Sequence, residues 1–216
     1  MSTVPTRIDA AVLDSLNRIA APGDWWTGEE KLALSALART AFAERHLAPW
    51  LRQSTSESIE KSDLEPEVTR IVTKLAADAS QIDGAWAKEA TALVGAPAYV
   101  EMVSLASTMA VIDAFAEALG RPRADLPDAL EGDTARLVPE GVADIGAYVH
   151  MTDPWTDANV GRALTLSPSG NTLYRSLALA MYHEGQFYDL DWDRPISRPQ
   201  AEVVATAVSA ANECFY

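Results

Sequence analysis

Apolar side chains recur every third or fourth residue along most of the first 120 positions, which is the spacing of one face of an α-helix. This pattern predicts helices over residues 7–19, 27–47, 66–75 and 82–94. Thr27 opens the second of these helices as part of a capping box. Because no run of alternating β-branched residues predicts a strand, the predicted fold class is all-α.

The longest predicted helix covers residues 97–119 and is apolar on nearly every side. Such a pattern is typical of a helix that is buried all round, so we expect it to be the central helix of the fold. Glu101, Asp113 and Glu117 interrupt the apolar run, which argues against a membrane span. Gly120 is a helix-ending residue and marks its end.

The remaining stretches are less regular. Residues 53–63 are polar and rich in serine, and we expect a loop there. Residues 121–157 contain several prolines and acids, and a connection of this length is uncommon inside a compact domain unless it is functional or joins two halves. Shorter helices are predicted over 159–166 and 172–182, and a last helix follows the cap Ser197. Its predicted buried stripe consists of Val203, Val204, Ala207, Val208 and Ala211.

Composition narrows the class of protein. The 216 residues are 48% apolar, which is enough for one domain with a substantial core. The formal net charge of −14, without a basic block, argues against nucleic acid and anionic membranes as partners. The single cysteine excludes an internal disulfide and fits a reducing compartment. The N-terminal residues lack the pattern of a signal peptide, so we expect a cytoplasmic protein.

Few residues form a familiar catalytic or ligand-binding pattern. The three histidines, His46, His150 and His183, lack the spacing of a zinc site. There is no glycine-rich phosphate loop and no Gly-x-Ser-x-Gly elbow. The acids that follow Asp189 lack the glycine and the final glutamate of a calcium loop. We therefore predict neither a metal nor a cofactor.

The remaining candidate site is Glu202 with Cys214. A thiolate is a strong nucleophile, and a nearby carboxylate can serve as its base. The two residues are twelve positions apart, which places them about 120° apart on an uninterrupted helix. They can cooperate only if the chain bends near Asn212. The alternative is that a lone cysteine near a helix end is a small buried apolar residue.

The stretch SRPQAEVVATAVSAANECFY, which starts at Ser197, resembles the cysteine-bearing segment of the alkylhydroperoxidase D-like/carboxymuconolactone decarboxylase family. In the peroxidase branch of that family, a glutamate precedes the first cysteine of a Cys-x-x-Cys motif by twelve residues, as Glu202 precedes Cys214. The stretch NECFY around Cys214 is similar to the sequence that leads into the second motif cysteine in a two-half subgroup of that family. Two further stretches, NVGRALTLSP from Asn159 and WWTGEE from Trp25, resemble recurrent stretches of the same subgroup.

This resemblance implies an alkylhydroperoxidase-like helical bundle that reduces peroxides, with Cys214 as attacking thiolate and Glu202 as proton acceptor or relay. The sequence ends one residue before the position of a second motif cysteine, and the motif histidine is absent too. We therefore expect impaired or incomplete turnover that needs an external thiol reductant. A shortened sequence, a selenocysteine codon read as a stop, and a natural degenerate member are alternative explanations.

The resemblance also implies two halves within a single domain, residues 1–216. The first would be a degenerate copy over about 1–120, followed by a linker over about 121–157 and the motif-bearing half over about 158–216. Aligning Glu30 with Glu202 places Phe42 opposite Cys214. Members of the family form homo-oligomers, so a non-catalytic helical oligomerisation module of the same fold is the second hypothesis.

Overall fold

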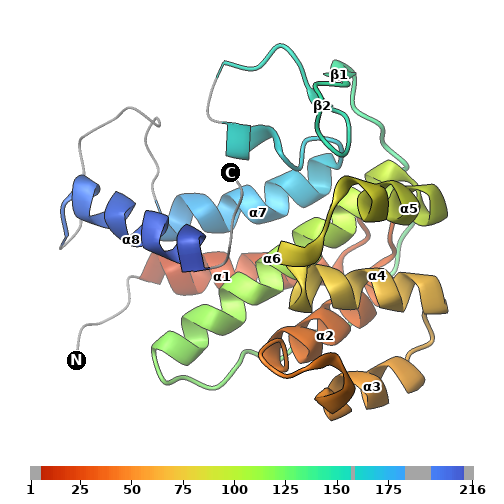
Figure 1. The fold of residues 1–216 in the computed structure, drawn as a ribbon, viewed down its shortest axis with the longest axis horizontal. Coiled ribbons are helices and arrows are strands. Elements are labelled where there is room, and N and C mark those ends of the chain that lie inside the picture. Colours follow the sequence, from red (N-terminus) through yellow and green to blue (C-terminus); the bar gives the residue numbers. More distant parts are fainter. Residues whose placement is uncertain (1–5, 157–158, 183–195, 212–216) are drawn as a thin grey trace.

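The regular apolar spacing forms α-helices along most of the chain (Figure 1). The computed structural model describes residues 6–156, 159–182 and 196–211. Within these residues the α-helices are α1 (Thr6–Ala20), α2 (Gly28–Ala43), α3 (Gln53–Glu60), α4 (Pro66–Ala77), α5 (Gly84–Val94), α6 (Ala96–Ala118), α7 (Pro168–Met181) and α8 (Arg198–Ala211). The shorter elements are three 3₁₀ turns, Pro49–Leu51, Ala79–Gln81 and Asn159–Arg162, and the paired strands β1 (Val142–Ala143) and β2 (Met151–Thr152). The all-α prediction is confirmed.

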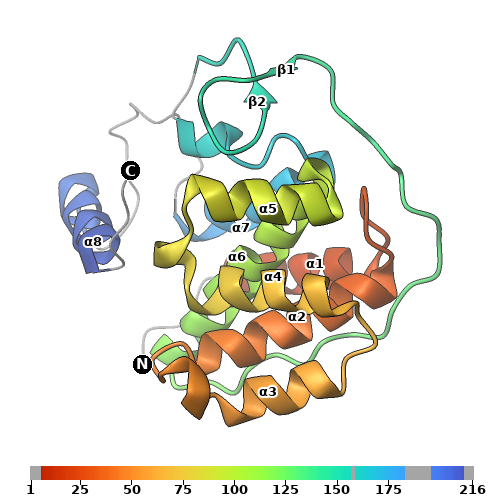
Figure 2. The ribbon, with the colours of Figure 1, turned by 45° about the vertical axis from the view of Figure 1, so that its right-hand side comes forward.

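Helix α6 is the centre of the bundle, as its uniformly apolar sequence predicts. It contacts α1, α2, α4, α5 and α7 (Figures 1 and 2). Met102, Leu105 and Met109 on this helix are completely buried. By length and composition α6 would suffice to cross a membrane, but 67% of its most apolar stretch is buried inside the protein. The core helix of a soluble protein passes the same test.

The start of α2 confirms the predicted capping box. The Glu30 backbone N–H donates to the Thr27 hydroxyl at 3.2 Å, and the Thr27 N–H donates to the Glu30 carboxylate at 2.8 Å. The indole N–H of Trp26 donates to the Ala98 carbonyl at 3.1 Å, which ties the same turn to α6. These contacts fix where α2 enters the core between α4 and α6.

The prediction of a loop over residues 53–63 is wrong, because helix α3 occupies Gln53–Glu60. A distant side chain stabilises its first turn: the Glu44 carboxylate accepts the N–H groups of Ser54 and Thr55 at 2.8 and 2.9 Å. Burial opposes ionisation of Glu44, yet the bonds from Thr55 and Ser54 outweigh it and lower its pKa to about 2. A cap supplied from outside the segment leaves no local signal for the helix.

The described part of the predicted irregular segment, residues 121–156, is irregular as expected and includes only the short β1–β2 pair as regular structure. It runs along the outside of the bundle (Figure 2) and forms backbone hydrogen bonds with the turn between α1 and α2. The N–H groups of Leu130, Ala135 and Arg136 donate to the carbonyls of Ala20, Gly23 and Asp24, respectively.

Helix boundaries in the second half differ from the prediction. The predicted helix over 159–166 is only a 3₁₀ turn, Asn159–Arg162. Helix α7 begins at Pro168, a turn earlier than expected, because the Ser167 hydroxyl accepts the Gly170 N–H at 3.2 Å. Helix α7 then packs against α1 and α6, which belong to the predicted first half.

The prediction of a buried stripe on α8 is wrong, because Val203, Val204, Ala207, Val208 and Ala211 are all exposed. Val203 is 69% exposed and Val204 is 57% exposed. Only Arg198 and Ala201 are buried on this helix, which lies at the periphery in both views (Figures 1 and 2). Apolar spacing identifies a stripe on a helix but not whether the same chain covers it.

Two glycines that each begin a helix give a matched stability test. A Cβ at Gly28 would collide with the Ala20 carbonyl oxygen and lie 2.8 Å from that of Leu130, whereas a Cβ at Gly84 would make an ordinary 3.4 Å contact with Tyr148. We expect Gly28→Ala to lower the free energy of unfolding by about 1–3 kcal/mol through overpacking. Gly84→Ala should instead raise it by about 0.4–1 kcal/mol. Urea unfolding measures both, and equal effects of the two substitutions would contradict the close approach at Gly28.

Candidate functional site

Glu202, the candidate proton acceptor, lies on the more buried face of α8. This face also carries the buried residues Arg198 and Ala201 and the half-buried residues Ala205 and Ser209. The Arg198 guanidinium is 2.6 Å from the Glu202 carboxylate, one helical turn away. The side chain of Arg198 is 8% exposed and that of Glu202 is 44% exposed. Glu202 is therefore a paired carboxylate at the edge of the protein.

Tyr182 joins this pair from the end of α7. The Arg198 guanidinium lies 5.9 Å from the centre of the Tyr182 ring. Burial raises the pKa of the Tyr182 hydroxyl, and its hydrogen bond to Glu202 and the charge of Glu202 raise it further. We call these three residues the α7–α8 polar group. Its chemistry is that of a carboxylate between a permanent cation and a neutral hydroxyl, an arrangement suited to accepting and passing on a proton.

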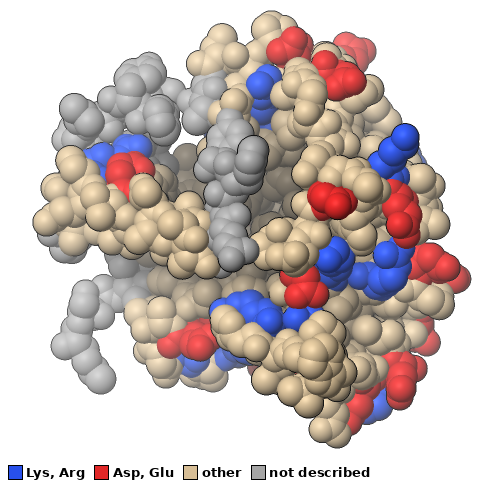
Figure 3. Space-filling view, in the orientation of Figure 1, with Lys and Arg blue, Asp and Glu red and all other residues tan. Residues whose placement is uncertain are grey.

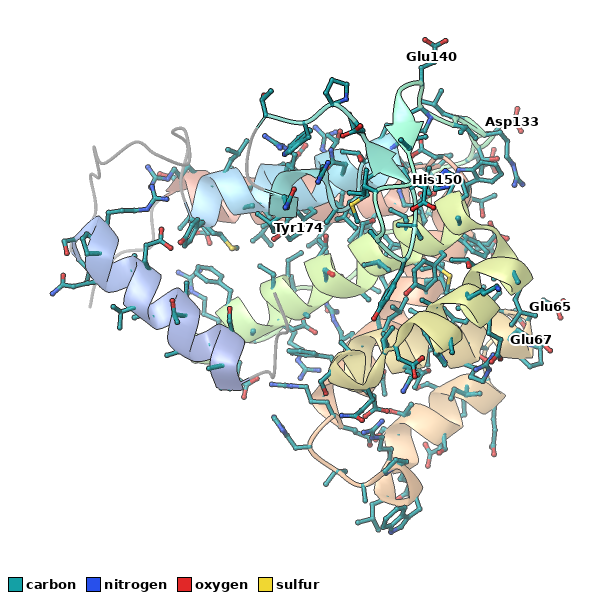
Figure 4. All side chains as sticks on the ribbon, turned by 45° about the horizontal axis from the view of Figure 1, so that its top comes forward. Glu65, Glu67, Asp133, Glu140, His150 and Tyr174 are labelled. Carbon is teal, nitrogen blue, oxygen red and sulfur yellow. The ribbon has the colours of Figure 1, made fainter. Side chains whose placement is uncertain are left out.

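The other residues singled out from the sequence are not brought to this group. Cys214 and His183 lie outside the described residues, as does the bend expected near Asn212. His46 and His150 are exposed, and His150 lies beside the β1–β2 pair (Figure 4). In the described ranges, no cluster of three or more histidine, cysteine and acidic residues has the arrangement of a metal site.

A buried polar cluster, which sequence reasoning missed, lies where the α1–α2 turn meets α6 and α7. Its members are Asp24, Lys31, Glu101, Ser167 and Ser169. One Asp24 carboxylate oxygen accepts the Ser167 hydroxyl, the Ser169 N–H and the Ser169 hydroxyl, each at 2.8 Å. Asp24 therefore binds the first turn of α7, and its hydrogen bonds to Ser169 connect residues that are 145 positions apart in the sequence.

Glu101 and Lys31 complete the buried polar cluster. Glu101 is 1% exposed and accepts the Trp25 N–H at 2.7 Å, while its other oxygen has no hydrogen-bond partner in the described part of the chain. The Lys31 ammonium donates to the carbonyls of Arg18 and Ala21 at 2.8 and 3.0 Å. A Cβ at position 23 would collide with the Glu101 carboxylate, so a side chain there would have to displace Glu101.

Burial controls the charges of this cluster. It raises the pKa of Glu101, and it lowers the pKa of Lys31. The charge of Lys31 opposes the shift of Glu101, whereas that of Asp24 reinforces it. These groups are withdrawn from solvent and hydrogen-bonded to backbone atoms of α1, the α1–α2 turn and α7, so the cluster connects these segments to α2 and α6.

A second buried pair links α2 and α6. The Arg39 guanidinium lies 2.9 Å from the carboxylate of Asp113, which is 1% exposed, and Arg123 lies 3.7 Å from the same oxygen. Burial raises the pKa of Asp113, and the charges of Arg39 and Arg123 oppose that shift. This pair fixes the end of α6 opposite the buried polar cluster.

Part of the missed arrangement had a signal in the sequence. Arg198 precedes Glu202 by four residues, which is the spacing of an ion pair on a helix. Glu101 and Asp113 are charged residues within an otherwise apolar helix, which predicts buried partners. Nothing local indicates that those partners lie in the α1–α2 turn and on α2.

Comparisons with protein-family models, with curated proteins and with solved structures give no match.

Replacing Glu101 tests the electrostatics of the buried cluster. A carboxyl whose pKa is higher in the folded than in the unfolded state contributes full stability below its ordinary pKa of 4.5, and that contribution is lost as the pH rises through the folded pKa. Glu101→Gln has no proton to lose there. We expect its stability to rise relative to the wild type as the pH increases from about 4.5 to 8. Thermal unfolding across this range measures the difference. Glu29→Gln, at an exposed position, is the control. If the difference in stability between the wild type and Glu101→Gln stays constant with pH, the raised pKa of Glu101 is refuted.

Proposed function

We propose that the protein is an alkylhydroperoxidase-like thiol peroxidase in which Cys214 attacks the peroxide and Glu202 accepts the proton. The observation that supports this proposal best is the position of Glu202 in the α7–α8 polar group. The same glutamate is the one that the resemblance to the peroxidase family assigns as proton acceptor. The geometry of Arg198 and Tyr182 around it is independent of that resemblance.

Arg198 and Tyr182 both interact with the Glu202 carboxylate. The buried Arg198 guanidinium lies 2.6 Å from the Glu202 carboxylate and orients it. The Tyr182 hydroxyl, whose raised pKa keeps it neutral, is a donor that can exchange a proton with the carboxylate. Deprotonating a thiol requires such a base, because the thiolate is the reactive form of cysteine.

The proposed reaction starts when Glu202 takes the thiol proton of Cys214, directly or through Tyr182. The thiolate sulfur attacks one peroxide oxygen, the O–O bond breaks, and the leaving alkoxide takes up a proton to become an alcohol. Cysteine is oxidised to a sulfenic acid and the peroxide is reduced. An external thiol then condenses with the sulfenic acid and releases water, and a second external thiol frees Cys214 as the external disulfide forms.

Trapping the sulfenic acid tests this proposal. Treatment of the folded protein with an alkyl hydroperoxide and dimedone should label Cys214, as read by mass spectrometry. Glu202→Gln should slow labelling by about a hundredfold, the lower end of the usual contribution of a general base.

The matched control is Glu89→Gln, which breaks the exposed 2.7 Å pair between Glu89 and Arg70 on other helices. It should label at the wild-type rate. A Cys214 that stays unlabelled in the folded protein refutes the proposal, and equal rates for Glu202→Gln and wild type refute the role of Glu202.

The second candidate function is a non-catalytic helical module that assembles with a second copy of the chain. The observation that favours it is the orientation of α8, whose more buried face carries Arg198 and alanines while Val203 and Val204 point outward. In the space-filling view, charged atoms gather over the side of the molecule opposite to α8, and α8 itself carries a small red and blue patch (Figure 3). With a net charge of −14, two copies repel each other least where the exposed valines of α8 meet their equivalents.

Polar substitution on α8 tests this second function. Light scattering should give the wild type a mass above the 23.2 kDa of one chain, and Val203→Ser with Val204→Ser should reduce it to that value. Leu93→Ser, at a residue 50% exposed on α5, is the control and should leave the mass unchanged. Assembly should also survive Cys214→Ser. A wild type that is already monomeric would contradict this function.

A further inference from the structure

A cavity of about 260 Å³ lies between the end of α4, the middle of α6 and the irregular segment over residues 121–157. Its apolar walls include Leu75, Ile82, Val103 and Ala106. An apolar cavity of about 150 Å³ is enough to bind a benzene molecule. This cavity therefore has room for a molecule of one or two rings.

Three hydroxyl groups line the same cavity, on Tyr99, Ser107 and Tyr148. Tyr99 is only 6% exposed, whereas Tyr148 is 58% exposed and forms the outer wall. Within the described residues, no hydrogen bond joins any of these hydroxyls to another group. The hydroxyls of Tyr99 and Ser107 are reached by solvent, so both can bond to a ligand or to water that enters the cavity.

The lining carries no charged side chain. Burial and the neighbouring Tyr148 raise the pKa of Tyr99, so its hydroxyl stays protonated and can both donate and accept. An ionised ligand would lose its hydration here without gaining a counter-charge. The chemistry therefore matches a neutral ligand with an apolar body and a polar group that bonds to hydroxyls.

We propose that this cavity binds a neutral aromatic molecule of one or two rings that carries a single hydroxyl group. The rings lie against the walls from α4 and α6, and the ligand hydroxyl bonds to Tyr99 and Ser107. Tyr148 closes the outer side: its ring lies 3.4 Å from where a Cβ of Gly84 would be, at the start of α5. This inference requires no reaction at Cys214.

Isothermal titration calorimetry of the protein with 2-naphthol tests the site. We expect saturable binding to the wild type. Tyr99→Phe removes one hydrogen bond and should weaken binding by about 3–10-fold. Val103→Phe fills the cavity and should weaken it at least tenfold. Val111→Phe on the same helix, at a residue 37% exposed and outside the lining, should leave the affinity unchanged.

Two further measurements define the ligand class and guard against misfolding. The anion 2-naphthoate should bind at least tenfold more weakly than 2-naphthol, because its charge has no partner in the lining. Ser107→Leu, at a half-buried position, fills the cavity from another side and keeps the test valid if Val103→Phe does not fold. Three results would each overturn the proposal. The first is that binding does not saturate at millimolar 2-naphthol. The others are that a folded cavity-filling variant binds 2-naphthol with wild-type affinity, or that 2-naphthoate binds as tightly as 2-naphthol.

Discussion

The fold depends on the carboxylate of Asp24, which is 3% exposed and receives three hydrogen bonds from Ser167 and Ser169. A buried charge is tolerated only where hydrogen bonds and opposite charges replace its hydration. Ser167 and Ser169 at the start of α7 supply the hydrogen bonds, and Lys31 on α2 supplies a positive charge. Glu101 brings α6 to the same place through the Trp25 N–H. Four segments are thus fixed by one polar centre inside an apolar bundle.

This centre also determines where the candidate chemistry lies. Because α7 is fixed at its first turn and packs along α1 and α6, its far end places Tyr182 beside α8. Arg198 then sits against Tyr182 and holds Glu202. The polar face of α8 is thereby the face turned toward the protein, and its valines are turned outward. The candidate base Glu202 and the exposed valines therefore lie on opposite faces of one helix.

The sequence predicts the helices well where the evidence is local. The capping box at Thr27, the uniformly apolar α6 and the irregular segment before α7 all follow from neighbouring residues. It fails where a distant group decides, as with the cap that Glu44 gives to α3. For the candidate site, spacing identifies Glu202 and its neighbour Arg198, but only the three-dimensional path of α7 brings Tyr182 to them. The alkylhydroperoxidase-like architecture and the two repeated halves stay predictions.

The long separation between Asp24 and Ser169 also bears on how the protein folds. Their hydrogen bonds span 145 residues, so closing this contact orders a very long loop and carries a large entropic cost. Contacts of such high sequence separation slow folding. During synthesis, α1 emerges early but lacks the α7 surface against which it packs until most of the chain has left the ribosome. A nascent chain therefore keeps apolar surface of α1 and α6 accessible to chaperones until α7 docks.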